Sequence, residues 1–152
     1  MSAVFVQIGQ CGNQVGAAFW EECLRGFGAE KQKHRPQDSL SLRLAERQND
    51  KLPLLLIDSE AKAVRGALAE SRRMKSAVRE SNIVLDRPGR GGNWALGYHG
   101  GGDGGSPNRL LEQAMDSYRK ELERCDHFGG TVILHSLAGG TAAGKAIVMS
   151  LR

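Results

Sequence analysis

The sequence predicts a single α/β domain with a parallel sheet in the middle and helices on both faces. Short apolar, partly β-branched runs recur along the chain, and each is followed by a polar or glycine-rich turn and then by helix-forming residues. The 152 residues suffice for one domain with one core. Because strands that alternate with helices form parallel sheets, we expect the turns to gather at the carboxyl edge of the sheet.

Composition excludes several classes of protein. Hydrophobic residues make up 40% and charged residues 25%, as in ordinary globular proteins. The net charge is +4, but the basic residues are spread out without interleaved aromatic side chains, which disfavours a nucleic-acid partner. The three cysteines form no C-x-x-C pair, so we expect neither a zinc site nor disulfides. No apolar run approaches the ~20 residues of a membrane span, and the N-terminus lacks signal-peptide features.

The chain opens with residues 3–8, an apolar run that predicts a central strand buried on both faces. Residues 9–16 then predict a glycine-rich loop, and residues 17–24 predict a helix. The apolar residues near helical spacing in this region are Val15, Ala18, Phe19 and Cys23.

The first glycine-rich loop carries residues suited to a phosphate. Gly9 and Gly12 allow a ligand to approach the backbone closely, and the side chains of Gln10 and Asn13 can hydrogen-bond phosphate oxygens or metal-bound water. Alternatively, Gly9 is an ordinary turn and Asn13 a helix cap.

Residues 26–51 are polar and predict a surface excursion, whereas residues 51–58 predict the next buried strand. Asp58 and Glu60 follow this strand, so they belong to the carboxyl edge of the sheet and suit a water-mediated Mg²⁺ site. The alternative, which can hold at the same time, is that Asp58 or Ser59 caps the following helix, with Glu60 favouring its dipole.

The middle of the chain predicts a helix over residues 61–79, a short extended segment over 81–86, a glycine-rich loop over 87–107 and a helix over 108–124. The glycines of the long loop can present N–H groups to a terminal phosphate. An apolar stripe on the last helix predicts a core face, formed by Leu111, Ala114, Met115, Tyr118 and Leu122.

Near the C-terminus, residues 131–134 predict a buried strand, a turn follows at residues 138–141, and residues 142–151 predict a helix. A glycine turn between a strand and a helix is suited to bind phosphate, although most such turns bind none. The segment nearly fits a Walker A loop that ends at Lys145, but Ala146 lacks the hydroxyl group that such a loop uses to hold Mg²⁺.

Four separated stretches are distinctive, namely Gly9–Gly16, Ile57–Glu60, Gly91–Ala95 and Ser136–Thr141. They resemble the first four nucleotide loops of the tubulin family, in order and at similar spacing, with further similarity at Arg119-Lys120-Glu121 and Cys125-Asp126. The resemblance covers the whole chain but only the N-terminal part of a family member. The Ala138 variant, the opening Met1-Ser2 and residues 94–98 are more similar to delta-tubulins than to the alpha or beta kinds.

The resemblance implies a Rossmann-like three-layer fold, with residues 1–152 as a partial nucleotide-binding (GTPase) domain that binds GTP and Mg²⁺. It also implies that Asp58 and Glu60 face the metal, through water, and that the loop at Gly91 covers the γ-phosphate. The expected nucleotide-binding residues are Gln10, Cys11, Asn13, Asp58, Glu60, Gly91, Gly92, Asn93, Ser136, Ala138, Gly139, Gly140, Thr141, Ala142 and Gly144.

The chain departs from the family at two loops. Gly92 replaces the first amide of Asn-Asn-Trp, and Ala142-Ala143 replaces Gly-Ser in the last phosphate loop. An alanine where the backbone needs a positive φ costs about 1 kcal/mol, and a lost charge-assisted hydrogen bond about 1.5–3 kcal/mol. We therefore expect GTP affinity to fall by about one to three decades.

Two alternatives stay open. A degenerate interaction module would keep the fold and lose the nucleotide, as the two departures suggest. A P-loop NTPase would depend on Lys145, but it leaves the Gln-Cys-Gly-Asn-Gln and Gly-Asn-Trp stretches unexplained.

The family loops that contact ribose and guanine, and the loop that activates the attacking water, have no counterpart here. We therefore expect no catalytic residue and no hydrolysis by this chain alone, and a partial gene product. The resemblance implies other tubulin subunits or microtubule and centriole components as partners, and a place in the cytoplasm and cytoskeleton, including the centriole or basal body.

Overall fold

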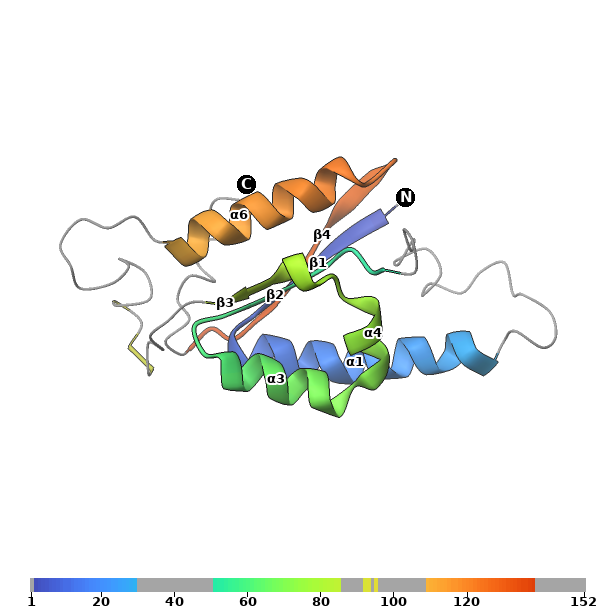
Figure 1. Cartoon of the computed structure of the whole chain (residues 1–152), viewed down its shortest axis with the longest axis horizontal. Coiled ribbons are helices and arrows are strands. Elements are labelled where there is room, and N and C mark those ends of the chain that lie inside the picture. Colours follow the sequence, from blue (N-terminus) through green and yellow to red (C-terminus); the bar gives the residue numbers. More distant parts are fainter. Residues whose placement is uncertain (1, 30–50, 86–91, 94, 96–108, 139–152) are drawn as a thin grey trace.

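The computed structural model describes residues 2–29, 51–85, 92–93, 95 and 109–138. Within this part of the chain, four strands form one parallel sheet in the order β3-β2-β1-β4 (Figure 1). Helices α1, α3 and α4 cover one face and α6 covers the other, which confirms the predicted three-layer fold. In chain order the elements are β1 (Ser2–Ile8), α1 (Gly9–Ala29), β2 (Leu54–Asp58), α3 (Ala61–Glu70), α4 (Arg72–Ala77), η2 (Glu80–Asn82), β3 (Ile83–Leu85), α6 (Arg109–Glu123) and β4 (Phe128–His135).

Alternation along β1 separates the core into two halves. Val4, Val6 and Ile8 pack on the α6 side, whereas Phe5 packs on the α1 side with Trp20. Because successive strand residues point to opposite faces, a run of apolar residues serves both layers of helices. Every residue of β2 is buried as well, so the two central strands have the burial that their composition predicts.

The predicted loop over residues 9–16 is wrong, because α1 begins directly at Gly9. The predicted apolar stripe on this helix is only partly confirmed: Cys23 packs against the core and Phe19 stacks on Phe5, but Phe19 is still 37% exposed and Val15 is 53% exposed. The face with Gly12 and Gly16 lies against the sheet instead. A Cβ at Gly12 would lie 2.1 Å from the carbonyl oxygen of Leu134, and one at Gly16 would lie 2.1 Å from the amide of Gln7. Small residues thus decide which face of α1 is buried.

Helix α1 also continues to Ala29, so the first residues of the predicted excursion over residues 26–51 are helical. Residues 30–50 of that excursion lie outside the described part of the chain.

The single helix predicted over residues 61–79 is interrupted at Ser71, where φ is −120° and ψ is 93°. The hydroxyl of Ser71 accepts a hydrogen bond from the N–H of Met74 at 3.2 Å and donates to Glu21 Oε2 at 2.7 Å. Glu21 also pairs with Arg73. The break is therefore fixed by contacts with α1, while Val64 and Met74 still face the core as predicted.

Strand β4 is longer and less buried than the strand predicted over residues 131–134. It spans Phe128–His135, and its residues from Gly130 onward are only half-buried. In the described part of the chain β4 pairs only with β1, so one of its edges has no strand beside it.

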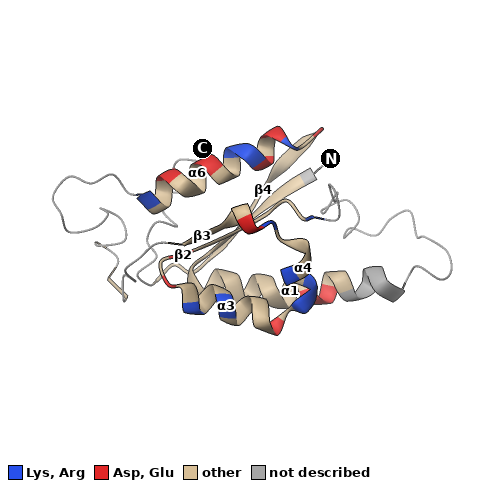
Figure 2. Cartoon of the chain, in the orientation of Figure 1, with Lys and Arg blue, Asp and Glu red and all other residues tan. Residues whose placement is uncertain are grey.

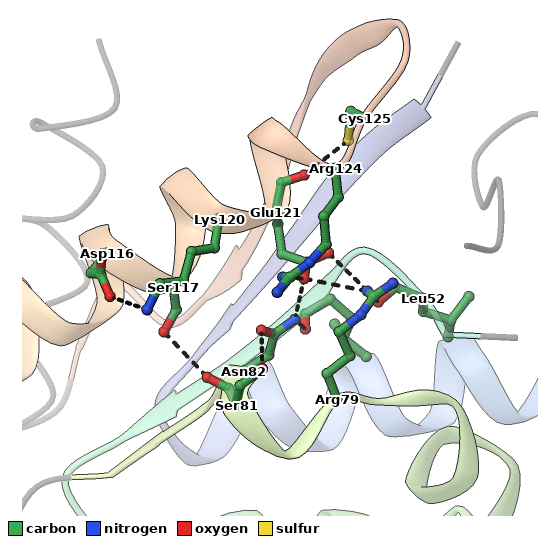
Figure 3. A network of polar contacts seen from close by, with 11 residues as sticks. Leu52, Arg79, Ser81, Asn82, Asp116, Ser117, Lys120, Glu121, Arg124 and Cys125 are labelled. Atoms are coloured by element: carbon green, nitrogen blue, oxygen red, sulfur yellow. Dashed lines mark hydrogen bonds and ion pairs between the residues drawn. The ribbon is translucent and has the colours of Figure 1, made fainter. Parts of the chain in front are cut away.

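A buried polar network ties α6 to the start of β2 and to η2 (Figure 3). Glu121 is 1% exposed and accepts hydrogen bonds from Arg79 Nη1 at 3.0 Å and from Asn82 Nδ2 at 2.9 Å. Asn82 Nδ2 also donates to the carbonyl of Leu54 at 3.1 Å, and Arg124 pairs with Glu121. The predicted helix over residues 108–124 is thus confirmed, with an ionic anchor at its C-terminal end in addition to its apolar stripe.

Candidate functional site

The carboxyl ends of three strands lie side by side at one edge of the sheet. In the strand register Ile8 pairs with Ile57 on one side and with His135 on the other. The residues that follow these three positions therefore leave the sheet at neighbouring points. The sequence predicted this convergence from the parallel arrangement, and we call this edge, with residues 9–13, 58–60 and 136–138, the rim.

The first turn of α1 occupies the centre of the rim. Gly9 has a φ of 72°, a left-handed conformation that favours glycine and lets the strand pass into the helix without an intervening loop. The first N–H groups of a helix have no partner within the helix, and its dipole adds about half a positive charge there. Gln10 and Cys11 are exposed on this turn. The turn can thus receive an anion through its backbone.

Asn13 is fully buried and links this turn to β2. Its Nδ2 donates to the carbonyl oxygens of Gly9 at 2.9 Å and Ile57 at 3.3 Å. Asn13 lies inside the helix, so the alternative that it caps the helix is wrong. Its Oδ1 is buried without a hydrogen-bond partner among the described residues. A buried acceptor of this kind costs stability unless a water molecule or ligand supplies a donor.

Asp58 and Glu60 lie at the end of β2, and their environments differ. Asp58 is 3% exposed, and its Oδ1 accepts a hydrogen bond from the N–H of Glu60 at 3.0 Å. Glu60 is the N-cap of α3, but its side chain makes no capping bond and is exposed. The buried carboxylate thus fixes the turn, and the exposed one faces solvent at the rim.

The turn after β4 completes the described rim. Ser136 Oγ accepts a hydrogen bond from the N–H of Ala138 at 3.1 Å, and His135 Nδ1 lies 2.8 Å from the carbonyl oxygen of Ser136. Ser136 and Ala138 are both exposed. The close packing of Gly12 on Leu134 holds the first turn of α1 beside this segment.

The remaining predicted residues are described only in part. Gly92 and Asn93 are exposed, and Gly92 has a φ of 38°, where a glycine is favoured. The other expected residues lie outside the described part of the chain, namely Gly91, Gly139, Gly140, Thr141, Ala142 and Gly144, together with most of the predicted loop over residues 87–107 and the predicted helix over 142–151.

The described residues hold no group of three or more His, Cys, Asp or Glu side chains that could bind a metal ion. A cation at Asp58 and Glu60 would therefore need water and ligand oxygens to complete its coordination. Cys11, Cys23 and Cys125 form no disulfide with one another. In the same part of the chain no helix is both long and apolar enough to cross a membrane.

Comparison with known proteins connects the chain to one family. Residues 2–151 match the family described as "Tubulin/FtsZ family, GTPase domain". The chain is 35% identical over 156 residues to the tubulin delta chain of Macaca fascicularis, covering 95% of this chain and 33% of that protein. It is 34% identical over 154 residues to the tubulin beta chain of Trichophyton rubrum, covering 96% of this chain and 33% of that protein.

The chain thus spans about a third of the length of these relatives. The family match covers nearly every residue, and the strand and turn arrangement agrees with the resemblance seen in the sequence. The chain belongs to the Tubulin/FtsZ family and corresponds to part of its GTPase domain.

Proposed function

We propose that this chain binds GTP together with Mg²⁺ at the rim. The observation that carries the proposal is the position of the first turn of α1, which lies between the ends of β2 and β4. The first N–H groups of a helix have no partner within the helix and suit an anion. The buried, unpaired Oδ1 of Asn13 supports it, because this acceptor is suited to a donor from a water molecule in the nucleotide shell.

Each side of the rim has a distinct role in this proposal. Gln10, Cys11 and the helix N-terminus bind phosphate oxygens, and the turn from Ser136 to Gly144 surrounds the α- and β-phosphates. Asp58 and Glu60 hold Mg²⁺ through water, a geometry that suits two carboxylates without a third. Gly91, Gly92 and Asn93 cover the γ-phosphate. Magnesium supplies charge neutralisation for the phosphates, and the residues of this chain orient them.

Titration calorimetry of the 152-residue chain with GTP and Mg²⁺ tests the proposal. We expect binding, and we expect Glu60→Gln to raise the Mg²⁺ concentration needed for it by about tenfold, because an exposed carboxylate at the rim is lost. Glu70→Gln is the matched control, since Glu70 is exposed at the far end of α3. Absence of binding at about 1 mM GTP would favour the interaction module, as would equal effects of the two variants.

At the cellular level we propose a tubulin-like cytoskeletal protein of the microtubule or centriole and cilium apparatus, with other tubulin subunits as partners. The delta and beta tubulin relatives support this role. Fluorescence microscopy of the tagged protein beside centriole and microtubule markers tests it. A diffuse distribution that stays unchanged when microtubules are depolymerised would contradict it.

A further inference from the structure

The outer surface of α3 and α4 carries an unusual concentration of positive charge. Residues 61–77 contain five basic residues and one acidic residue, Glu70. Val64, Ala67, Met74 and Ala77 of these helices face the core, so the charged residues lie on the opposite side. Figure 2 shows Lys and Arg along α3 and α4, whereas basic and acidic residues alternate on α6.

The pairing of these charges differs between the two sides of the molecule. On α6, Arg119 pairs with Asp116 and Glu123, and Lys120 pairs with Asp116, so the surface is neutralised internally. On α4, Arg73 pairs with Glu21 of α1. The four other basic side chains of residues 61–77 are exposed and form no ion pair with a described residue; they are Lys62, Arg65, Arg72 and Lys75, and we call them the cation face.

Nearby Lys51 is not part of this face. Its Nζ donates to the carbonyl oxygens of Ser76 at 2.8 Å and Val78 at 3.3 Å, at the end of α4. The basic residues next to the face are thus engaged in holding the fold, while the cation face itself is not.

A glycine lies among these cations without a packing reason. Gly66 is in the middle of α3, and a Cβ built there would meet nothing within 4 Å. A glycine inside a helix costs about 0.5–1 kcal/mol relative to alanine. Lys62 lies four residues before Gly66 and Ala69 three residues after it, so both share its outer side, while Glu70 follows at four residues on the other flank. The bare backbone at Gly66 thus lies beside Lys62 and leaves room for the backbone of another chain.

The geometry points to an acidic polypeptide segment of a partner protein as the ligand of the cation face, lying along α3 and α4 with its backbone over Gly66. Lys62 with Arg65 in α3 and Arg72 with Lys75 in α4 each form a pair three residues apart, one pair on either side of the break at Ser71. A segment with two groups of carboxylates can match both pairs at once.

Other occupants fit less well. Neither α3 nor α4 contains an aromatic residue on which a base could stack, which disfavours a single-stranded nucleic acid. Among the described residues the exposed large apolar side chains are Val15, Phe19, Phe128 and Leu137, and all lie on other elements. An amphipathic contact with a lipid surface needs such side chains on the same face.

Fluorescence anisotropy with the whole chain tests the inference. The probe is a labelled Glu/Ala peptide of about 20 residues, long enough as a helix to span both cation pairs. We expect the double variant Lys62→Ala with Arg65→Ala to bind it about fivefold to tenfold more weakly, since two exposed charge contacts are lost. The matched control, Arg119→Ala with Lys120→Ala, removes the same charge from α6 and should leave binding nearly unchanged.

A second variant tests whether the peptide contacts the surface at Gly66 or binds only because of the net charge of the protein. Gly66→Leu adds bulk where the described structure is open, so the folded state should keep or gain thermal stability while the peptide binds more weakly. Equal weakening by the two double variants would overturn the inference, because net charge alone would explain binding. Unchanged binding by Gly66→Leu would overturn it too, as would tighter binding of an oligonucleotide or an anionic vesicle that is lost in Lys62→Ala with Arg65→Ala.

Discussion

Arg79 Nη1 lies 3.0 Å from Glu121 Oε2, and the two side chains are 15% and 1% exposed. The pair joins the segment before β3 to the C-terminal end of α6, and the same arginine donates to the carbonyl oxygen of Leu52 at 3.2 Å (Figure 3). The carboxylate of Glu121 also accepts a hydrogen bond from Asn82 and pairs with Arg124. At the end of the sheet opposite the rim, α6 is therefore held to the sheet by ionic contacts as well as by apolar packing.

Removal of this carboxylate should be strongly destabilising. We expect Glu121→Ala to lower the free energy of unfolding by about 3–5 kcal/mol, because a mostly buried arginine and a buried amide lose the carboxylate that they share. Urea denaturation followed by circular dichroism measures it. Glu123→Ala, which breaks only the exposed pair with Arg119, should cost less than about 1 kcal/mol. A similar loss in both variants would contradict the role given to burial.

The contact of Gly12 with β4 should tolerate no side chain. A Cβ there would lie 2.1 Å from the carbonyl oxygen of Leu134, which is backbone and cannot rotate away. We expect Gly12→Ala to separate the first turn of α1 from β4, with a loss of about 1–3 kcal/mol in stability. Thermal unfolding measures the change, and Gly66→Ala is the control that should stabilise by about 0.5–1 kcal/mol. An unaltered midpoint for Gly12→Ala would show that α1 is not packed as described.

The hydroxyl of Ser71 should contribute through two hydrogen bonds, one to the N–H of Met74 and one to Glu21. We expect Ser71→Ala to destabilise the chain by about 1–2 kcal/mol, as loss of a helix cap does elsewhere. Ser76→Ala removes an exposed hydroxyl that donates only to the carbonyl of Arg73, and it should cost a few tenths at most. Chemical denaturation of both variants decides whether the break between α3 and α4 depends on Ser71.

The cysteines should differ in reactivity. Burial, and then the nearby charge of Glu22, raises the pKa of the Cys23 thiol above its usual value. Because only the thiolate reacts, alkylation of Cys23 should stay slow at neutral pH and accelerate only as the pH rises through that higher pKa.

Cys11 is exposed on the first turn of α1, so iodoacetamide should reach it without unfolding. If GTP with Mg²⁺ binds at the rim, it should slow the alkylation of Cys11 and leave Cys23 unaffected. Mass spectrometry of the labelled peptides follows each site, and equal protection of both thiols would argue against a ligand at the rim.

The central strands β1 and β2 and helix α6 were predictable from the sequence, because apolar runs and an apolar stripe indicate burial directly. The convergence of Gln10, Asp58 and Ser136 followed from the parallel arrangement of strands alone. Both predictions need only the local pattern of apolar residues and the rule that the carboxyl ends of parallel strands share one edge of the sheet.

The errors have a common cause in contacts between distant segments. Val15 has the spacing of a core stripe, yet it is exposed because Gly12 and Gly16 supply the face of α1 that lies against the sheet. Ser71 ends α3 because Glu21 on another helix holds its hydroxyl. Glu121 resembles any surface glutamate until Arg79 is placed beside it. No local pattern encodes such contacts, which override intrinsic propensity.

The direct passage from β1 into α1 at Gly9 has a mechanical consequence. No loop separates β1 from the first turn of α1 at the rim, and β1 is hydrogen-bonded to β2 on one side and to β4 on the other. Force exerted on that turn by a bound anion would thus reach three strands at once. Amide hydrogens along β1, β2 and β4 should then slow their exchange in concert when the rim is occupied, so that the sheet itself reports occupancy.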